Sequence, residues 1–114
     1  MHELSIVSSL IELCEENARV KNASKIEEIV VKIGRLSGIE IELFKRCFDS
    51  FKEGSIYCKN ALLSVEITPF EIHCLSCDKK SILEKNIFRC PKCDSIDLKV
   101  LSGEDMYLMR LIMT

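Results

Sequence analysis

The sequence lacks several features that mark common classes of protein. It contains no tryptophan, only four glycines and two prolines, and no glycine-rich loop that could hold a phosphate group. No apolar run reaches the roughly 20 residues that a transmembrane helix requires. The first basic residue is Arg19, so the N-terminus lacks the charged region of a signal peptide. These absences argue against a membrane or secreted protein, and we expect a cytoplasmic protein with no membrane span.

An excess of positive charge is also missing. Sixteen basic residues stand against 18 acidic residues, which gives a formal net charge of -2, and the two signs are interspersed along the chain. Proteins that neutralise nucleic-acid phosphates normally carry a basic stripe. The densest candidate here is Lys79-Lys80 with Lys85 and Arg89. The charge pattern therefore argues against nucleic acid as a partner.

What the sequence does contain is a pair of C-x-x-C motifs separated by twelve residues. Four thiolates at this spacing can bind one tetrahedral Zn(II), and a shell of four cysteines leaves no position for water or substrate. The few large apolar residues between the motifs cannot form a core of their own, so metal must supply about 10 to 16 kcal/mol of folding energy. We therefore predict a structural zinc-ribbon module. Its ligands are Cys74, Cys77, Cys90 and Cys93.

The chemistry of the remaining cysteines is less informative. Disulfides are disfavoured in a reducing compartment, and a thioredoxin-like redox centre would need one C-x-x-C motif and not two. Cys14 and Cys47 fall on apolar helical faces and are predicted core residues. Cys58 falls in a predicted loop, and its role stays open.

Hydrophobic periodicity predicts two amphipathic helices. The first spans 5–19, and the second spans about 39–52, with Ser37 to Glu40 in the S-x-x-E form of a capping box. Both helices are expected to pack one face into the core of the protein. For the first helix this face contains Ile6, Val7, Leu10, Ile11, Leu13, Cys14 and Ala18, and for the second it contains Phe44, Cys47, Phe48 and Phe51.

Three segments are predicted to form strands of one sheet. Residues 25–33 are rich in β-branched side chains, and residues 61–68 alternate apolar with polar side chains. The intervening helix permits a right-handed crossover with these two strands parallel. Residues 105–114 have two apolar faces, so we expect a covered, central or nearly central strand that could pair with 61–68 like an antiparallel hairpin.

The expected fold is therefore α+β (α/β), with a small mixed three-stranded sheet, two helices and an inserted four-cysteine zinc-ribbon module. The α/β domain should comprise residues 1–69 and 103–114, and the inserted zinc-binding domain residues 70–102. With 114 residues and 47% hydrophobic side chains, the chain can form one modest core plus such a module.

A second candidate metal site lies at the N-terminus. The α-amine of Met1, the deprotonated amide nitrogen of residue 2 and a ring nitrogen of His2 can chelate one ion, and nickel(II) and copper(II) favour such nitrogen-rich sites. Glu3 adds an amide nitrogen and a carboxylate. The alternative is an exposed histidine on a frayed terminus.

Two further residues have more than one interpretation. His73 precedes Cys74 and can replace a thiolate in the zinc site, donate a hydrogen bond to a ligand sulfur, or face solvent from a strand. Glu40 is explained by the capping box without any metal.

Several of these features occur together in one known family. The opening MHELSI, the segment VKIGRLSGIE at 31–40, the aromatic-rich helix ending in FDSF at 48–51, the two cysteine motifs and the closing apolar strand cover nearly the whole chain. In this combination the chain resembles the HypA/HybF family of hydrogenase nickel-incorporation proteins. The resemblance implies a metallochaperone that is not an enzyme.

The resemblance also implies roles for individual residues and partners. Transferable nickel would bind through His2 and the backbone nitrogens of His2 and Glu3, with Glu40 as an additional ligand, while structural zinc would bind the four cysteines. The nickel-handling GTPase HypB and the large subunit of [NiFe] hydrogenase would be partners, and some relatives also serve urease. The alternatives are a zinc-ribbon nucleic-acid binder and an adaptor protein with structural zinc.

Overall fold

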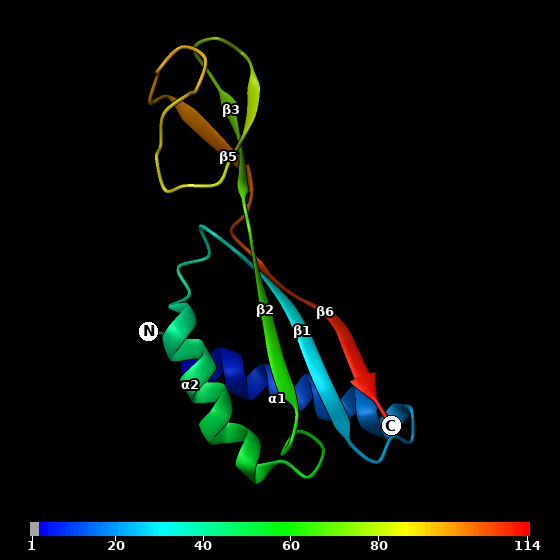
Figure 1. Cartoon of the computed structure of the whole chain (residues 1–114). Coiled ribbons are helices and arrows are strands. Elements are labelled where there is room, and N and C mark those ends of the chain that lie inside the picture. The colour runs from blue at the N-terminus through cyan, green and yellow to red at the C-terminus, as the bar shows by residue number, and fades with distance from the viewer. Residues whose placement is uncertain (1–2) are drawn as a thin grey trace. The chain divides into compact units, whose positions relative to one another are not determined.

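The computed structural model describes residues 3–114 and contains two small sheets and two long helices (Figure 1). One sheet has the strand order β2-β1-β6, and the other has the order β4-β3-β5. This arrangement confirms the predicted fold class, and the predicted ribbon is itself a three-stranded sheet. In chain order the elements are α1 (Glu3–Val20), β1 (Ile26–Gly34), α2 (Ile41–Phe51), the short 3-10 helix η1 (Lys52–Gly54), β2 (Leu62–Thr68), β3 (Phe70–Cys74), β4 (Lys80–Leu83), β5 (Leu98–Ser102) and β6 (Met106–Met113).

The chain divides into two compact units. The first comprises the chain up to Val31 together with Ile39–Val65 and Leu108–Thr114, and the second comprises Lys32–Gly38 and Glu66–Tyr107. Both units are therefore assembled from segments that are distant in sequence. No helix within residues 3–114 is long and apolar enough to cross a membrane.

Backbone hydrogen bonds define the directions of the strands around β1. Ile26 N–H donates to the Tyr57 carbonyl just before β2, and Arg35 N–H donates to the Thr68 carbonyl at its end, so β1 and β2 are parallel. Thr114 N–H donates to the Lys25 carbonyl, and Gly34 N–H donates to the Asp105 carbonyl, so β6 runs antiparallel to β1. The sheet is mixed, as predicted.

The position of β6 differs from the prediction. Since β1 lies between β2 and β6, the expected hairpin of 61–68 with 105–114 does not form, and β6 is an edge strand among the described strands. Tyr107 and Met109 are 57% and 49% exposed. The prediction that residues 105–114 form a covered strand, which rested on their two apolar faces, is therefore wrong.

The core of the first unit is formed by one face of each helix and by β1. The helices α1 and α2 pack against each other. Leu13 and Phe51, which were predicted to be buried, are 48% and 39% exposed, because each lies at the margin of its apolar stripe. The buried apolar residues of this unit are Val7, Leu10, Ile11, Cys14, Ala18, Ile26, Ile29, Val31, Phe44, Cys47, Phe48, Cys58 and Ala61.

Cys14 and Cys47 are buried, as predicted, and the loop cysteine Cys58 is fully buried as well. The Cys58 thiol contacts Cys14, and this contact lowers the pKa of Cys58 to about 7 while raising that of Cys14 above its usual range. Cys58 N–H also donates to Ser55 Oγ at 3.1 Å. These contacts join α1 to the turn before β2.

The second unit is centred on β3, which pairs antiparallel with β4 on one side and β5 on the other. Alternate residues of β3, namely Phe70, Ile72 and Cys74, are fully buried. Gly103 has a φ of 103°, and a Cβ at this position would overlap Phe70. This close approach of two backbones requires glycine.

Candidate metal centres

The structure brings the four predicted cysteine ligands together in the second unit. Their sulfur atoms all lie within 4.8 Å of one another. Cys74 and Cys93 sulfurs are 3.5 Å apart, and Cys77 and Cys90 sulfurs are 3.6 Å apart. Four sulfurs at 2.3 Å from one tetrahedral zinc would be separated by about 3.8 Å. The cluster therefore has the size that a single tetrahedral ion requires.

Two turns of the same geometry present these sulfurs. Asp78 N–H donates to the Cys74 carbonyl at 2.9 Å, and Asp94 N–H donates to the Cys90 carbonyl at 2.8 Å. Asp78 and Asp94 both have positive φ angles, of 60° and 64°. Aspartate tolerates this left-handed conformation better than most residues. The two C-x-x-C motifs are thus equivalent knuckles that face each other.

Backbone N–H groups favour the charged form of two ligands. The Cys77 N–H lies 3.4 Å from Cys74 Sγ and lowers the pKa of the Cys74 thiol. Burial raises the pKa of Cys90, but hydrogen bonds from the N–H groups of Cys93 and Lys92 outweigh it and lower this pKa to about 6. Thiolates are the metal-binding form, so Cys74 and Cys90 are prepared for a cation, whereas burial raises the pKa of Cys77 and contacts with the other cysteines raise that of Cys93.

His73 lies on β3 next to the first knuckle. It is opposite Lys80 on β4 and Lys99 on β5, and its Nε2 lies 2.6 Å from Asp78 Oδ1. A carboxylate on the knuckle thus holds the imidazole ring. The metal-ligand cluster found among the described residues consists of the four cysteines and does not include His73.

The predicted nickel site is described only in part. His2 lies outside the described residues, whereas Glu3 is the first residue of α1 and only 2% exposed. Glu3 Oε2 accepts a hydrogen bond of 3.0 Å from the Glu40 N–H, 37 residues further along the chain. This bond is the main cause that lowers the pKa of Glu3 to about 2. Two of the predicted site residues therefore meet at the start of both helices.

The local role predicted for Glu40 is wrong. Glu40 is the N-cap of α2, but its side chain makes no capping hydrogen bond, and the helix begins at Ile41. The Ser37 to Glu40 capping box would have required the helix to begin three residues earlier. The carboxylate that binds the backbone at this helix start belongs to Glu3, and no local spacing in the sequence signals that contact.

The fold and these sites define a class: a small α/β protein with an inserted four-cysteine metal-binding module. A family described as "Hydrogenase/urease nickel incorporation, metallochaperone, hypA" matches residues 1–113. The chain belongs to this HypA family of nickel metallochaperones that act in hydrogenase maturation. The resemblance seen in the sequence is thereby confirmed, and the nucleic-acid-binding and adaptor alternatives are not favoured.

Similar proteins agree over almost their full length. The hydrogenase maturation factor HypA of Campylobacter jejuni is 66% identical over 113 residues, which cover 99% of each chain. The HypA of Aquifex aeolicus is 43% identical over 111 residues, covering 97% of this chain and 96% of that protein. A solution structure of the Ni metallochaperone HypA from Helicobacter pylori is 39% identical, covers 99% of this chain and 97% of its own, and has a TM-score of 0.72.

Proposed function

We propose that this protein binds nickel(II) at its N-terminus and delivers it for maturation of [NiFe] hydrogenase. The ligands are the α-amine of Met1, the His2 side chain and the backbone nitrogens of His2 and Glu3, with Glu40 as an additional ligand. Nickel is the cargo of the protein, and the protein itself catalyses no reaction. Membership of the nickel-incorporation family supports the cargo, and the nitrogen-rich donor set suits nickel.

The contact between Glu3 and Glu40 is the observation that supports this site most directly. The Glu3 carboxylate is buried and accepts the Glu40 N–H, so residues 3 and 40 are adjacent although 37 positions separate them. The negative charge of Glu3 also lies at the start of α2, where the helix dipole stabilises it. Glu3 thereby positions the first turn of α1 beside Glu40, whose side chain is exposed and makes no capping bond.

Zinc is the metal that we assign to Cys74, Cys77, Cys90 and Cys93. Soft thiolates in a tetrahedral arrangement suit zinc, and four protein ligands leave no open position for exchange. The compact sulfur cluster fits this assignment. The bound zinc would hold the two knuckles together. The nickel, by contrast, would remain transferable because its site is open and rich in nitrogen donors.

The proposed partners follow from the delivery function. Nickel would be received or passed on with the nickel-handling GTPase HypB and inserted into the hydrogenase large subunit, and urease accessory proteins are further candidates. This exchange would take place in the cytoplasm. We propose that the zinc module influences nickel binding through His73, whose ring is held by Asp78. A substitution of His73 tests this coupling.

Nickel titration tests the terminal chelate. We would compare the zinc-loaded native protein with His2→Ala and with a variant that has one extra residue before Met1, using calorimetry and the absorption bands of nickel. We expect one tight site in the native protein and affinity at least about tenfold lower in both variants, because each removes a nitrogen donor from its chelate ring. Equal zinc content and thermal stability would serve as the control. If all three proteins bind nickel alike, the proposed site is wrong.

A further inference from the structure

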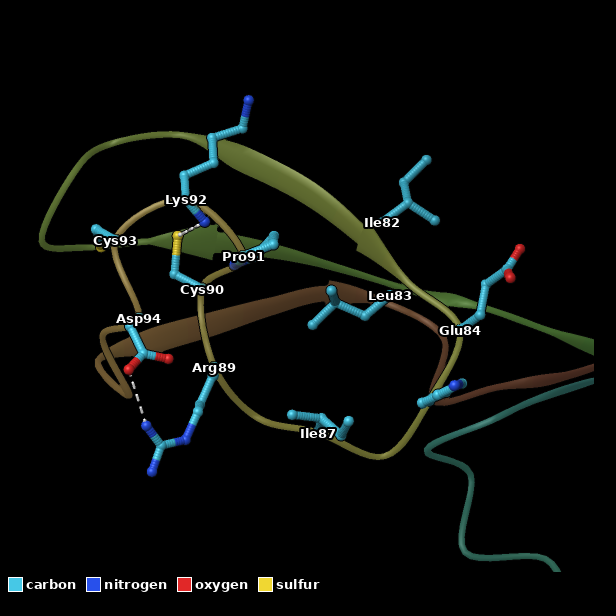
Figure 2. A pocket seen from close by; sticks show the side chains of 11 residues that line it. Ile82, Leu83, Glu84, Ile87, Arg89, Cys90, Pro91, Lys92, Cys93 and Asp94 are labelled. Atoms are coloured by element: carbon cyan, nitrogen blue, oxygen red, sulfur yellow. Dashed lines mark hydrogen bonds and ion pairs between the residues drawn. The ribbon is translucent and has the colours of Figure 1, made fainter.

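A groove of about 980 Å³ lies on the four-cysteine module, within the second unit (Figure 2). Its walls are β4, the loop that follows it, and the second knuckle, all within residues 82–94. Cys90 and Cys93 belong to the lining. One wall of the groove is therefore made from the predicted metal site itself.

Part of the lining of this groove is aliphatic and exposed to solvent. Ile82 and Ile87 are 66% and 57% exposed, and Leu83 and Pro91 also line the groove. Clustered exposed aliphatic side chains are characteristic of surfaces that bind another molecule. Ile82 belongs to β4 and Ile87 to the loop that follows it, so two different segments contribute exposed isoleucines to the lining.

The loop that carries Ile87 is anchored within the unit. The ring of its neighbour Phe88 stacks on the buried Phe70, with ring centroids 5.3 Å apart and planes 27° from parallel. The other end of the lining is fixed by the knuckle turn, in which Asp94 N–H donates to the Cys90 carbonyl. The aliphatic surface is thus held at both ends.

Basic side chains predominate around the groove. Arg89 forms an ion pair with Asp94 at 3.0 Å. The other charged residues of the lining are two basic side chains, Lys85 and Lys92, and one acidic side chain, Glu84. From Cys74 to Asp94 the chain has five basic and three acidic residues, whereas the remainder has 11 and 15. The backbone N–H of Lys92 donates to the Cys90 sulfur at 3.4 Å, while the Lys92 side chain extends away from this sulfur (Figure 2).

The edge strand in the lining of the groove favours an extended occupant. β4 pairs with β3 alone among the described strands, so it is an edge strand of its sheet and contributes both Ile82 and Leu83 to the lining. Edge strands can bind an extended segment of another chain, with alternate side chains entering pockets.

We propose that this groove binds an extended acidic segment of a partner protein. Aliphatic side chains of that segment cover Ile82 and Ile87, and its carboxylates face Lys85 and Lys92. Because Cys90 and Cys93 form one wall, metal in the cysteine cluster is required for this surface to exist. The module would therefore dock a partner only when it is loaded with metal.

Labelled peptides test the occupant directly. The probe is a fluorescent peptide of about eight residues that alternates glutamate and valine, with a lysine-valine and a glutamate-serine peptide for comparison. We would measure anisotropy and NMR shift changes with the zinc-loaded full-length protein at low salt. We expect the glutamate-valine peptide alone to bind with appreciable affinity, with shift changes confined to residues 80–94.

Matched variants locate the binding surface. We expect Ile87→Asp to weaken peptide binding at least about tenfold, and Lys85→Glu to weaken it a few fold with reduced salt dependence. Ile96→Asp and Lys99→Glu change exposed residues of the same module that do not line the groove, and both should bind like the native protein. Zinc content and unchanged shifts of β3 would verify that the variants fold.

Several outcomes would overturn the proposal. These are no binding of the glutamate-valine peptide, an equal loss in the Ile96→Asp variant, tighter binding of single-stranded RNA at the same residues, or concentration-dependent shifts without peptide that indicate self-association. Peptide binding that survives zinc chelation would refute the metal requirement. Nickel affinity should be unchanged in Ile87→Asp, so failure here is distinguishable from failure of the terminal nickel site.

Discussion

The two candidate metal centres differ in how the sequence produces them. The cysteine cluster is encoded locally, because two equivalent knuckles within residues 74–93 supply every ligand. The site at the start of α1 combines residues 37 positions apart through one hydrogen bond between Glu3 and Glu40. The most conspicuous motif thus marks the site to which we assign structural zinc, whereas the site proposed for the cargo depends on the fold.

The two centres also differ in chemistry. Four sulfurs enclose an ion completely, whereas a terminal amine, backbone nitrogens and one imidazole leave it open on at least one side. Removal of a single donor should therefore have different consequences in the two regions, and the following variants measure that difference.

The largest effect is expected from Cys90→Ser. This change removes one thiolate from the cluster, so the module should lose zinc and with it most of the roughly 10 to 16 kcal/mol that metal supplies to such modules. We would measure zinc per chain and the NMR spectrum of β3 to β5. The helical circular dichroism of α1 and α2 should persist as the control. A fully zinc-loaded, folded module in this variant would contradict the structural assignment.

Glu40→Gln should have the next largest effect, and it should act on nickel alone. If the Glu40 carboxylate is a ligand, nickel affinity falls by about tenfold, while the melting temperature stays the same because this side chain is exposed and makes no capping bond. Glu42→Gln is the matched control, because Glu42 is an exposed acid only two residues further along the chain, in the first turn of α2. Identical nickel binding by both variants would remove Glu40 from the ligand set.

A smaller effect on both nickel and stability is expected from Glu3→Gln. The amide keeps the shape of the side chain but loses the charge that interacts with the Glu40 N–H and the start of α2. The melting temperature should fall by a few degrees, and nickel affinity should fall together with it. Loss of nickel affinity without any change in melting temperature would indicate a direct ligand and not a positioning residue.

The pH dependence of this difference gives an independent check. The pKa of Glu3 is lowered from an ordinary 4.5 to about 2, so its contribution to stability is complete above about 4.5 and is lost as the pH falls towards about 2. The melting temperatures of the native protein and Glu3→Gln should therefore converge over this interval. A constant difference across it would show that the Glu3 charge is not responsible.

The smallest effect is expected from His73→Gln. The contact with Asp78 lies near the surface, with 89% of the Asp78 side chain exposed, and such pairs contribute less than about 1 kcal/mol. Zinc content should remain at one ion per chain. Loss of zinc would give His73 a direct part in the metal site, and a change in nickel affinity alone would support coupling between the two centres.

The parts of the fold that sequence predicted well depend on short-range patterns. The span of α1, the positions of β1 and β2, and the cysteine cluster follow from helical periodicity, alternation and ligand spacing, all of which act within a few residues. The same patterns define the buried faces of Val7, Leu10 and Phe44. Local chemistry was sufficient in these places.

The errors occurred where a distant segment determines the local environment. The capping box at Ser37 looked complete, yet the carboxylate at the start of α2 comes from Glu3. Residues 105–114 have the composition of a central strand. However, β1 takes the central position between β2 and β6, so β6 lies at the edge of the described sheet. Neither arrangement can be read from spacing, because each depends on which strands and helices meet.

The pairing of β3 with β5 has a consequence for the order of folding. Glu71 is paired with Ser102. Because Thr68 at the end of β2 and Met106 at the start of β6 are each only a few residues from this pair, the folded module brings these two strand ends together. Closing this long loop in advance lowers the entropic cost of adding β6 to β1 by about 2 kcal/mol. Zinc that binds before β6 pairs with β1 would thus favour the addition of this last strand to the sheet.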